Sequence, residues 1–129
     1  MPTWHELREH ARSKYQLTSD DEDSFGLVWA YEPGRTQLIT VGRFTAFEQD
    51  WVEFRSYVCK EDELSPRVAL RKNMDYAVGT LALDSDGDYL LVHRAPVASL
   101  DPDEFALPLR MLATMADDLE QEHTAKDDY

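Results

Sequence analysis

The chain of 129 residues is strongly acidic, with 26 Asp and Glu residues against 13 Lys and Arg and a net charge of −13. This charge argues against binding to nucleic acid or to an anionic membrane, because both need concentrated basic side chains. A hydrophobic fraction of 43% excludes a disordered chain. No apolar run approaches the length of a membrane span, and the N-terminus lacks a signal-peptide core. Together with a lone cysteine, these features predict one cytoplasmic domain.

The first half of the chain predicts one helix followed by three strands. Residues 2–17 carry apolar side chains at helical spacing, and Thr3 with Glu6 forms a capping box at the start. The acidic residues 18–24 are expected to form a solvated loop. Alternating apolar and polar side chains then predict an antiparallel meander of three strands, at residues 25–31, 37–44 and 51–59.

A short helix and a hairpin are predicted next. Ser65-Pro66 is typical of a helix start, and the helix should reach about residue 72. Three of its side chains are expected to face the core: Val68, Ala69 and Leu70. Two alternating strands follow, at residues 76–84 and 89–94. Asp86-Gly87 between them is expected to supply the positive φ angles of a tight hairpin.

The last helix, predicted for residues 102–122, has the best-defined start in the sequence. Asp101 is its expected N-cap, Pro102 takes the first helical position, and Glu104 completes a capping box. An apolar seam at helical spacing lies on one face of it: Phe105, Leu109, Leu112, Ala116 and Leu119. Pro108 predicts a kink near residues 106–108, or a turn followed by a helix that begins again at Pro108.

The order of these elements predicts an α+β fold, α-β-β-β-α-β-β-α, with a five-stranded antiparallel sheet packed against helices. No internal repeat or linker divides the chain. We expect a single domain over residues 1–122. The apolar pattern then stops, so residues 123–129 are expected to form an acidic, frayed tail.

The sequence offers no catalytic, cofactor-binding or metal-binding pattern. None of the five glycines lies in a phosphate-binding loop. Cys59 has no base beside it in the sequence and is expected to be a packed thiol. Asp84, Asp86 and Asp88 begin like a calcium loop, but Gly87 falls at the fourth place rather than the sixth, which favours a hairpin turn. We therefore expect a protein that is not an enzyme and has no cofactor.

Large aromatic residues are concentrated on the predicted strands. Alternation places them on both faces of the sheet, whereas the helices can cover only one face. Either they all belong to one core, or some remain exposed as a groove or a dimer contact. The residues predicted for a partner-binding surface are Trp29, Tyr31, Phe44, Phe47 and Trp51.

The second half of the chain carries a resemblance to known proteins. It rests on residues 69–122, namely Ala69-Leu70-Arg71-Lys72-Asn73, Gly79-Thr80-Leu81-Ala82-Leu83-Asp84 with Gly87, Tyr89-Leu90-Leu91-Val92-His93, Leu100-Asp101 and Ala116-Asp117-Asp118-Leu119-Glu120. In this pattern the chain resembles the YbjN-like proteins and the class I type III secretion chaperones, which share the predicted order of elements. Before Ala69 the resemblance rests on that order alone.

The resemblance implies a non-enzymatic, cytoplasmic protein that is commonly a homodimer. Secretion chaperones of this kind bind an extended, partly unfolded segment of an effector along apolar patches of the sheet and first helix. The implied function is a binding module that masks an apolar segment of a partner protein.

The net charge leaves a second function open, namely an acidic inhibitor or immunity protein that neutralises a basic partner. Salt distinguishes the two functions, because association through charge slows steeply with ionic strength and association through an apolar groove does not.

Overall fold

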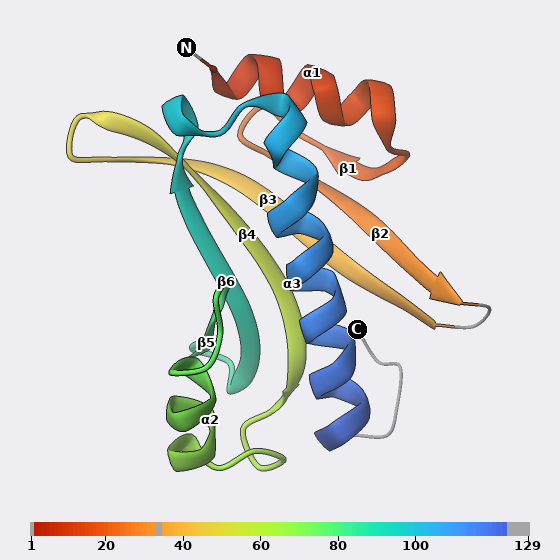
Figure 1. The fold of residues 1–129 in the computed structure, drawn as a ribbon, viewed down its shortest axis with the longest axis vertical. Helices are drawn as coiled ribbons and strands as arrows, with labels where there is room; N and C mark the ends of the chain where they lie inside the picture. The colour runs from red at the N-terminus through yellow and green to blue at the C-terminus, as the bar shows by residue number, and fades with distance from the viewer. Residues whose placement is uncertain (1, 33–34, 124–129) are drawn as a thin grey trace.

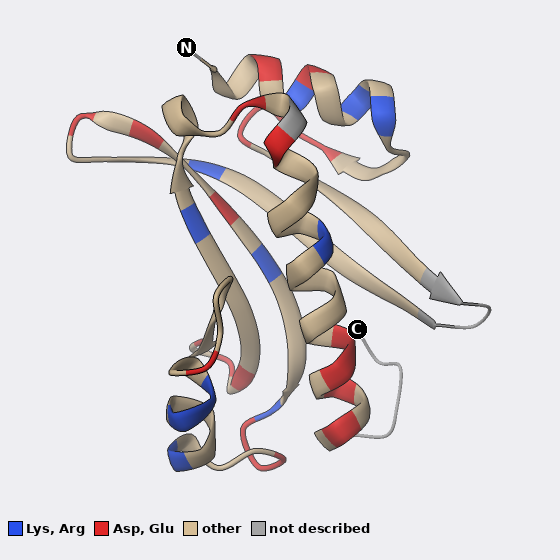
Figure 2. Cartoon of the chain, in the orientation of Figure 1, with Lys and Arg blue, Asp and Glu red and all other residues tan. Residues whose placement is uncertain are grey.

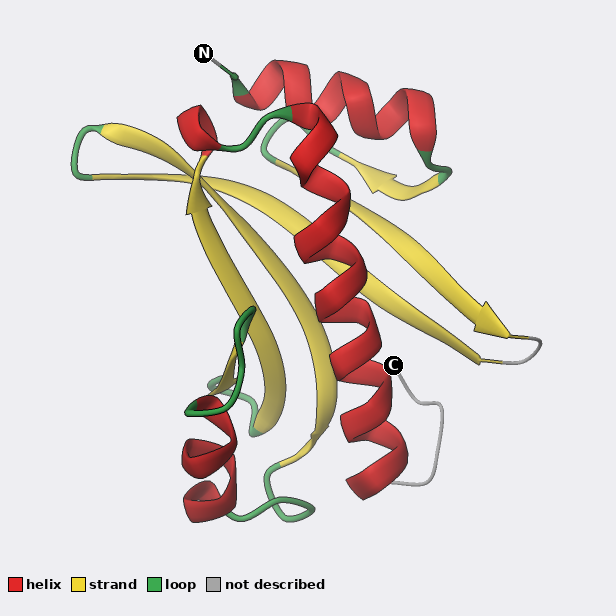
Figure 3. Ribbon diagram, in the orientation of Figure 1, coloured by secondary structure: helices red, strands yellow, loops and turns green. Residues whose placement is uncertain are grey.

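The computed structural model describes residues 2–32 and 35–123, and for residues 31, 32, 35 and 103 it describes the backbone only. Figures 1 and 3 show helices layered on one strongly twisted sheet. The elements, in chain order, are α1 (Trp4–Lys14), β1 (Leu17–Asp20), β2 (Ser24–Glu32), β3 (Arg35–Ala46), β4 (Gln49–Lys60), α2 (Pro66–Asn73), β5 (Thr80–Leu83), β6 (Asp88–Pro96), the short 3-10 turn η1 (Val97–Ser99) and α3 (Pro102–His123).

The sheet is antiparallel throughout and has the strand order β1-β2-β3-β4-β6-β5. This confirms the predicted α+β class, but the sheet has six strands rather than five. The prediction of a solvated loop at residues 18–24 was wrong for its first part, because residues 17–20 form β1 and pair with β2. The backbone of this acidic stretch forms hydrogen bonds with β2, and the side chains of the stretch show no alternating pattern that would predict a strand.

The core lies between one face of the sheet and the helices α1 and α3. Alternate strand residues such as Leu27, Ile39 and Phe54 point into it and are fully buried or nearly so. The ring of Phe54 lies 5.4 Å from that of Phe105 in α3. In the described part of the chain, the opposite face of the sheet has no helix over it, and Val28 and Leu38 there are 46% and 44% exposed.

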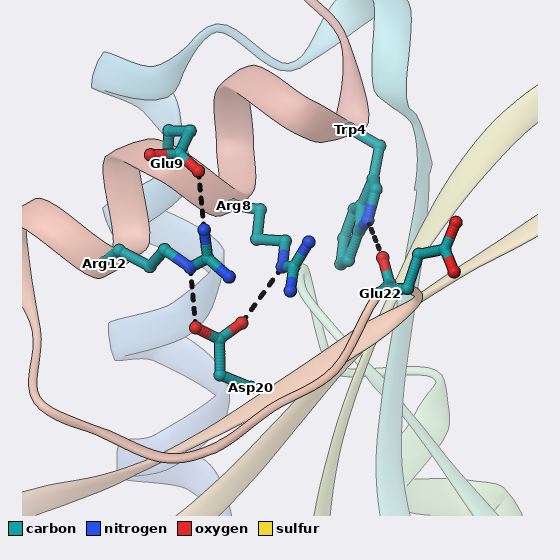
Figure 4. Close-up of polar contacts among 6 residues, drawn as sticks. All are labelled: Trp4, Arg8, Glu9, Arg12, Asp20 and Glu22. Carbon is teal, nitrogen blue, oxygen red and sulfur yellow. Dashed lines mark hydrogen bonds and ion pairs between the residues drawn. The ribbon is translucent and has the colours of Figure 1, made fainter.

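Helix α1 is fastened to β1 by a cluster of polar contacts (Figure 4). Arg8 and Arg12 both donate to the carboxylate of Asp20, at 3.0 and 2.6 Å, and the indole of Trp4 donates to the carbonyl of Glu22 at 2.8 Å. The hydrogen bond from Arg12, followed by that from Arg8, lowers the pKa of Asp20. The acidic stretch therefore serves to hold the first helix.

Helix α2 corrects a second prediction. Of the three side chains expected to face the core, only Ala69 is buried, whereas Val68 and Leu70 are 43% and 69% exposed. Consecutive residues of a helix point in directions about 100° apart, so a two-turn helix on the edge of the sheet can bury only one of them. Asn73 ends the helix and binds the backbone of Leu81 in β5 through its side-chain oxygen, at 2.7 Å, and its nitrogen.

The hairpin between β5 and β6 closes as a wider turn than predicted. Only Gly87 has a positive φ, of 83°, and Asp86 does not. The carboxylate of Asp84 accepts hydrogen bonds from the backbone of Asp86 and Asp88, at 3.0 and 2.9 Å. The turn is therefore shaped by an Asp side chain that folds back over it. Strand β5 is also shorter than expected and begins at Thr80.

Helix α3 runs unbroken from Pro102 to His123, with Pro108 inside it. The alternative of a helix that begins again at Pro108 was wrong, and a bend at Pro108 stays a prediction. The apolar seam is confirmed, because all five of its members are buried: Phe105, Leu109, Leu112, Ala116 and Leu119. None of the helices in the described residues is long and apolar enough to cross a membrane.

Candidate protein-binding surface

The open face of the sheet carries an aromatic pair. Phe44 in β3 and Trp51 in β4 are cross-strand partners, and their rings are stacked with centroids 6.2 Å apart. The guanidinium of Arg94 in β6 lies 5.6 Å from the centre of the Phe44 ring. The indole of Trp51 donates to the carbonyl of Ala46 at 2.9 Å, which fixes the ring beside the turn. Both rings are half-buried, so one side of the pair faces solvent.

Phe47 stands at the tip of the β3–β4 hairpin and is 90% exposed. Phe47 and Glu48 both have positive φ angles, of 51° and 63°, as a two-residue type I′ turn requires. Asn and Gly favour these angles, whereas Phe and Glu are strained by them. The fold gains no burial from Phe47, so an exposed aromatic ring is held here against the local backbone preference.

The five predicted surface residues do not form one patch. Phe44, Phe47 and Trp51 lie together at one end of the β3–β4 hairpin, which extends beyond the rest of the sheet in Figure 1. Trp29 points to the face that bears the helices, and its ring lies 6.2 Å from that of Tyr15. The backbone of Tyr31 lies in β2, but its side chain is outside the described residues.

Trp29 lies in a groove of about 460 Å³ between the end of α1, strand β2 and α3. The residues that line this groove are Lys14, Tyr15, Trp29, Ala106, Leu107 and Arg110. Trp29 is half-buried and Leu107 is 53% exposed. Burial raises the pKa of Tyr15, which is consistent with a largely apolar wall. Sequence reasoning missed the contribution of α3, because nothing in the sequence brings residues 106–110 beside Trp29.

The edge of β2 is open next to this groove. Strand β1 pairs with β2 only as far as Leu27, so in the described residues no strand lies beside the outer edge of β2 beyond it. An unpaired strand edge presents backbone donors and acceptors that can pair with an extended segment.

A second apolar patch lies at the other edge of the sheet. Leu70 of α2 and Met74, the C-cap of that helix, are 69% and 86% exposed, and Leu83 at the end of β5 is 47% exposed. A small cavity of about 180 Å³ with mostly apolar walls runs between α2 and β5. The spacing of Leu70 and Met74, about one helical turn apart, is the sequence signal for this patch, whereas Leu70 was predicted to face the core with Val68 and Ala69.

Charge is distributed unevenly over this surface (Figure 2). Helix α2 contributes Arg67, Arg71 and Lys72, and the end of α3 is acidic. Most basic residues elsewhere in the described chain are paired with carboxylates, as Arg43 is with Asp23 at 2.6 Å.

Cys59 and His93, the candidates for a nucleophile and a metal ligand, are both packed against the core of the protein. Cys59 is fully buried, and burial raises its pKa to about 11, so the prediction of a packed thiol is confirmed. The ring of His93 packs 5.9 Å from that of Phe54, and burial lowers its pKa. Within the described residues, no group of three or more His, Cys, Asp and Glu side chains is arranged to hold a metal ion.

A twisted antiparallel sheet with a long final helix across one face is the architecture of the type III secretion chaperones. The predicted resemblance to that class is confirmed at the level of the fold. The likeness to YbjN-like proteins stays a prediction.

Several solved structures match this fold, and three of them illustrate the likeness. A chain in the structure of the HopA1–SchA chaperone–effector complex matches with a TM-score of 0.65 and 15% identity, over 89% of this chain and 90% of that chain. One in the complex of the Yersinia pestis type III secretion chaperone SycH with a YscM2 fragment gives 0.60 and 18%, over 88% and 95%. One in the Pseudomonas aeruginosa ExoU–SpcU heterodimer gives 0.60 and 15%, over 90% and 95%. Identities this low establish the fold alone, and no protein-family model or curated protein matches the chain.

Proposed function

We propose that this protein is a cytoplasmic, non-enzymatic chaperone-like protein that binds an extended, apolar segment of a partner protein and masks it. The observation that carries this proposal is the exposed aromatic cluster of Phe44, Phe47 and Trp51 on a sheet face without a helix. Exposed apolar surface of this kind is typical of a binding site rather than of a free surface.

The shape of the surface favours an extended segment as the ligand. The outer edge of β2 is unpaired beyond Leu27, and the Trp29 groove lies beside it. A strand added to an open edge gains main-chain hydrogen bonds, while its alternate side chains enter grooves on the faces of the sheet. One matching chain is found in a chaperone–effector complex and another in the complex of a secretion chaperone with a fragment of YscM2, which supports a protein partner.

The proposal is tested by isolating the partner from the native host and then measuring its affinity for variants. Trp51→Ala and Phe47→Ala are expected to weaken the complex by at least tenfold each, since truncation of an aromatic hot spot at an interface costs about 2 kcal/mol or more. Val68→Ala is the control. It removes an apolar side chain that is 43% exposed and lies on α2, away from the aromatic cluster.

The melting temperature of each variant separates binding from folding. Phe47 makes little contact with the fold, so its variant should melt as the wild type does. A loss of partner affinity equal to that of the Val68 control, or the consistent absence of any defined partner, would contradict the proposal.

We also propose a homodimer, with the patch of Leu70, Met74 and Leu83 as its interface. These side chains are exposed on α2 and on β5, which is an edge strand of the described sheet. An exposed apolar stripe beside an open edge is suited to pairing with a second copy.

The net charge of −13 favours one alternative, an acidic inhibitor of a basic partner. The association rate of the isolated complex distinguishes the two. For the chaperone-like function it should change little between low and physiological salt, whereas an inhibitor that acts through charge should associate far more slowly as salt is added.

A further inference from the structure

The groove beside Trp29 is basic at its rim, although the protein as a whole is acidic. Lys14 at the end of α1 and Arg110 in α3 line it together with the apolar side chains of Trp29 and Leu107. Both cations are exposed. They are contributed by two helices that are about a hundred residues apart in the chain, so the fold alone brings them to one groove.

Among the side chains that the structure describes, these two cations differ from most others in that they have no carboxylate partner. Among the basic residues whose side chains the structure describes, seven form ion pairs: Arg8, Arg12, Arg43, Arg55, Lys60, Lys72 and Arg94. Four form no such pair: Lys14, Arg110, and Arg67 with Arg71 on α2.

Two neighbouring basic side chains without an ion pair in the described part of the chain, Lys14 and Arg110, are unexpected in so acidic a protein, because Asp and Glu outnumber Lys and Arg by 26 to 13. Arg67 and Arg71 on α2 also have no ion pair among the described residues, but Lys14 and Arg110 come from two different helices and meet at one groove. Two exposed cations therefore line the same groove as the half-buried Trp29 and the apolar side chain of Leu107. A ligand that places an apolar side chain on Trp29 and a carboxylate beside it satisfies both features.

We propose that the groove selects the register of the bound partner segment by accepting a short acidic-apolar motif, with its apolar side chain on Trp29 and Leu107 and its carboxylates at Lys14 and Arg110. This proposal rests on the proposed function and states which side chains the bound segment carries where it meets the Trp29 groove. The overall charge favours a basic partner, whereas the groove favours acidic residues locally. The segment can therefore dock in one position along its length rather than slide.

The experiment uses the full chain with 5-fluorotryptophan, in which the ¹⁹F signal of Trp29 is assigned from the Trp29→Phe variant. Three synthetic peptides of twelve residues are titrated, identical except that a central leucine pair is flanked by two Asp, two Asn or two Lys. We expect the Asp peptide to shift the Trp29 signal and to bind about tenfold more tightly than the Asn peptide, since two partly exposed ion pairs each contribute modestly. The Lys peptide should bind more weakly still.

Two double variants with the same change in net charge separate the local effect from the global one. Lys14→Glu with Arg110→Glu should reverse the preference, so that the Lys peptide binds more tightly than the Asp peptide. Arg67→Glu with Arg71→Glu alters the other unpaired cations, which lie on α2, and should leave the preference unchanged. Circular dichroism tests whether both variants fold, which is expected because all four side chains are exposed.

Each other result overturns the inference. Equal binding of the three peptides to the wild type would show an apolar groove without charge selection, and would leave the proposed function standing. Equal effects of the two double variants would show that overall charge alone matters. If no peptide shifts the Trp29 signal, the groove is not a binding site, and the proposed function is then judged separately by the Trp51 and Phe47 variants.

Discussion

At the scale of the residue, the clearest departure from what the fold needs is the turn at Phe47 and Glu48. A two-residue turn with positive φ at both positions is normally built from Asn and Gly. In this chain it is built from a large aromatic and an acidic residue, and the aromatic ring is 90% exposed. The arrangement reduces stability and presents an apolar side chain to the surroundings, which is the expected sign of a binding contact.

Replacement of this turn is expected to raise stability and lower binding together. Phe47→Asn with Glu48→Gly relieves the strain of two positive φ angles and should raise the free energy of unfolding by about 1 kcal/mol. Urea denaturation measures this change, with Val68→Ala as a surface control. The same double variant should bind the partner at least tenfold more weakly. A variant that is more stable and binds the partner normally would show that Phe47 has no part in recognition.

Burial also predicts how Cys59 reacts. Its pKa is raised to about 11, so at pH 8 the folded protein should react with a thiol reagent more than about 100-fold more slowly than the urea-unfolded chain, in which cysteine titrates normally. The release of the chromophore from a disulfide reagent measures both rates. Fast labelling of the folded protein would mean that the strand end opens to solvent readily.

At the scale of the element, the acidic stretch between α1 and β2 shows how charge builds structure here. Asp20 accepts from Arg8 and Arg12, and Asp23 pairs with Arg43. These contacts join helix α1 to the edge strand β1, and the turn after β1 to the long strand β3. The first helix, which forms one side of the Trp29 groove, is therefore held by these ion pairs as well as by its buried residues Trp4, Leu7 and Ala11.

The lowered pKa of Asp20 gives this contact a defined pH dependence. A carboxyl whose pKa is lower in the folded state stabilises the fold fully above its unfolded pKa, about 4, and the contribution is lost as the pH falls through the lower folded value. The Asp20→Asn variant should therefore be less stable than the wild type at pH 7, and the difference should vanish in acid. Thermal unfolding at several pH values measures it.

Asp21→Asn is the matched control for this test, because it removes the same charge from the neighbouring residue, for which the described contacts include no ion pair. It should change stability little at any pH. If both variants behave alike, the effect is one of net charge, and the double arginine contact contributes nothing specific.

The elements that follow a strong local pattern could be predicted from the sequence. The seam of α3 and the stripe of α1 with Trp4, Leu7 and Ala11 are both buried as expected. Strand β1 was missed because its side chains are mostly polar and exposed, and only its pairing with β2 makes it a strand. The inward face of α2 was misread because Val68, Ala69 and Leu70 are equally apolar, and only tertiary packing decides which of them is covered.

At the scale of the whole molecule, the sheet separates two surfaces with different expected partners. The hairpin end with Phe44 and Trp51, in β3 and β4, and the groove at Trp29, in β2, lie on opposite faces of the same sheet. The sequence could show that both faces carry aromatics, but it could not show that the rings divide into two sites, since that depends on where the helices lie. A bound segment that contacts both sites would have to pass around the sheet.

The exposed stripe on α2 gives the expected oligomeric state a direct test. Leu70→Glu should convert the homodimer to a monomer, because a charge in an apolar interface is costly to bury. Light scattering after size exclusion measures the mass, which should fall by half. Leu107→Glu, on α3 beside the Trp29 groove, is a control at another exposed leucine, 53% against 69% for Leu70, and should leave the dimer intact. A wild-type protein that is monomeric at all concentrations would overturn the proposed dimer.

Hydrogen–deuterium exchange of the protein alone and with its isolated partner tests the central claim, that this fold masks an extended segment. The account predicts slower exchange in two regions on partner binding, at residues 44–51 and along the edge of β2 from residue 28, together with protection of one short stretch of the partner. Slowed exchange confined to other surfaces, such as the acidic end of α3, with a partner that stays folded throughout, would contradict it.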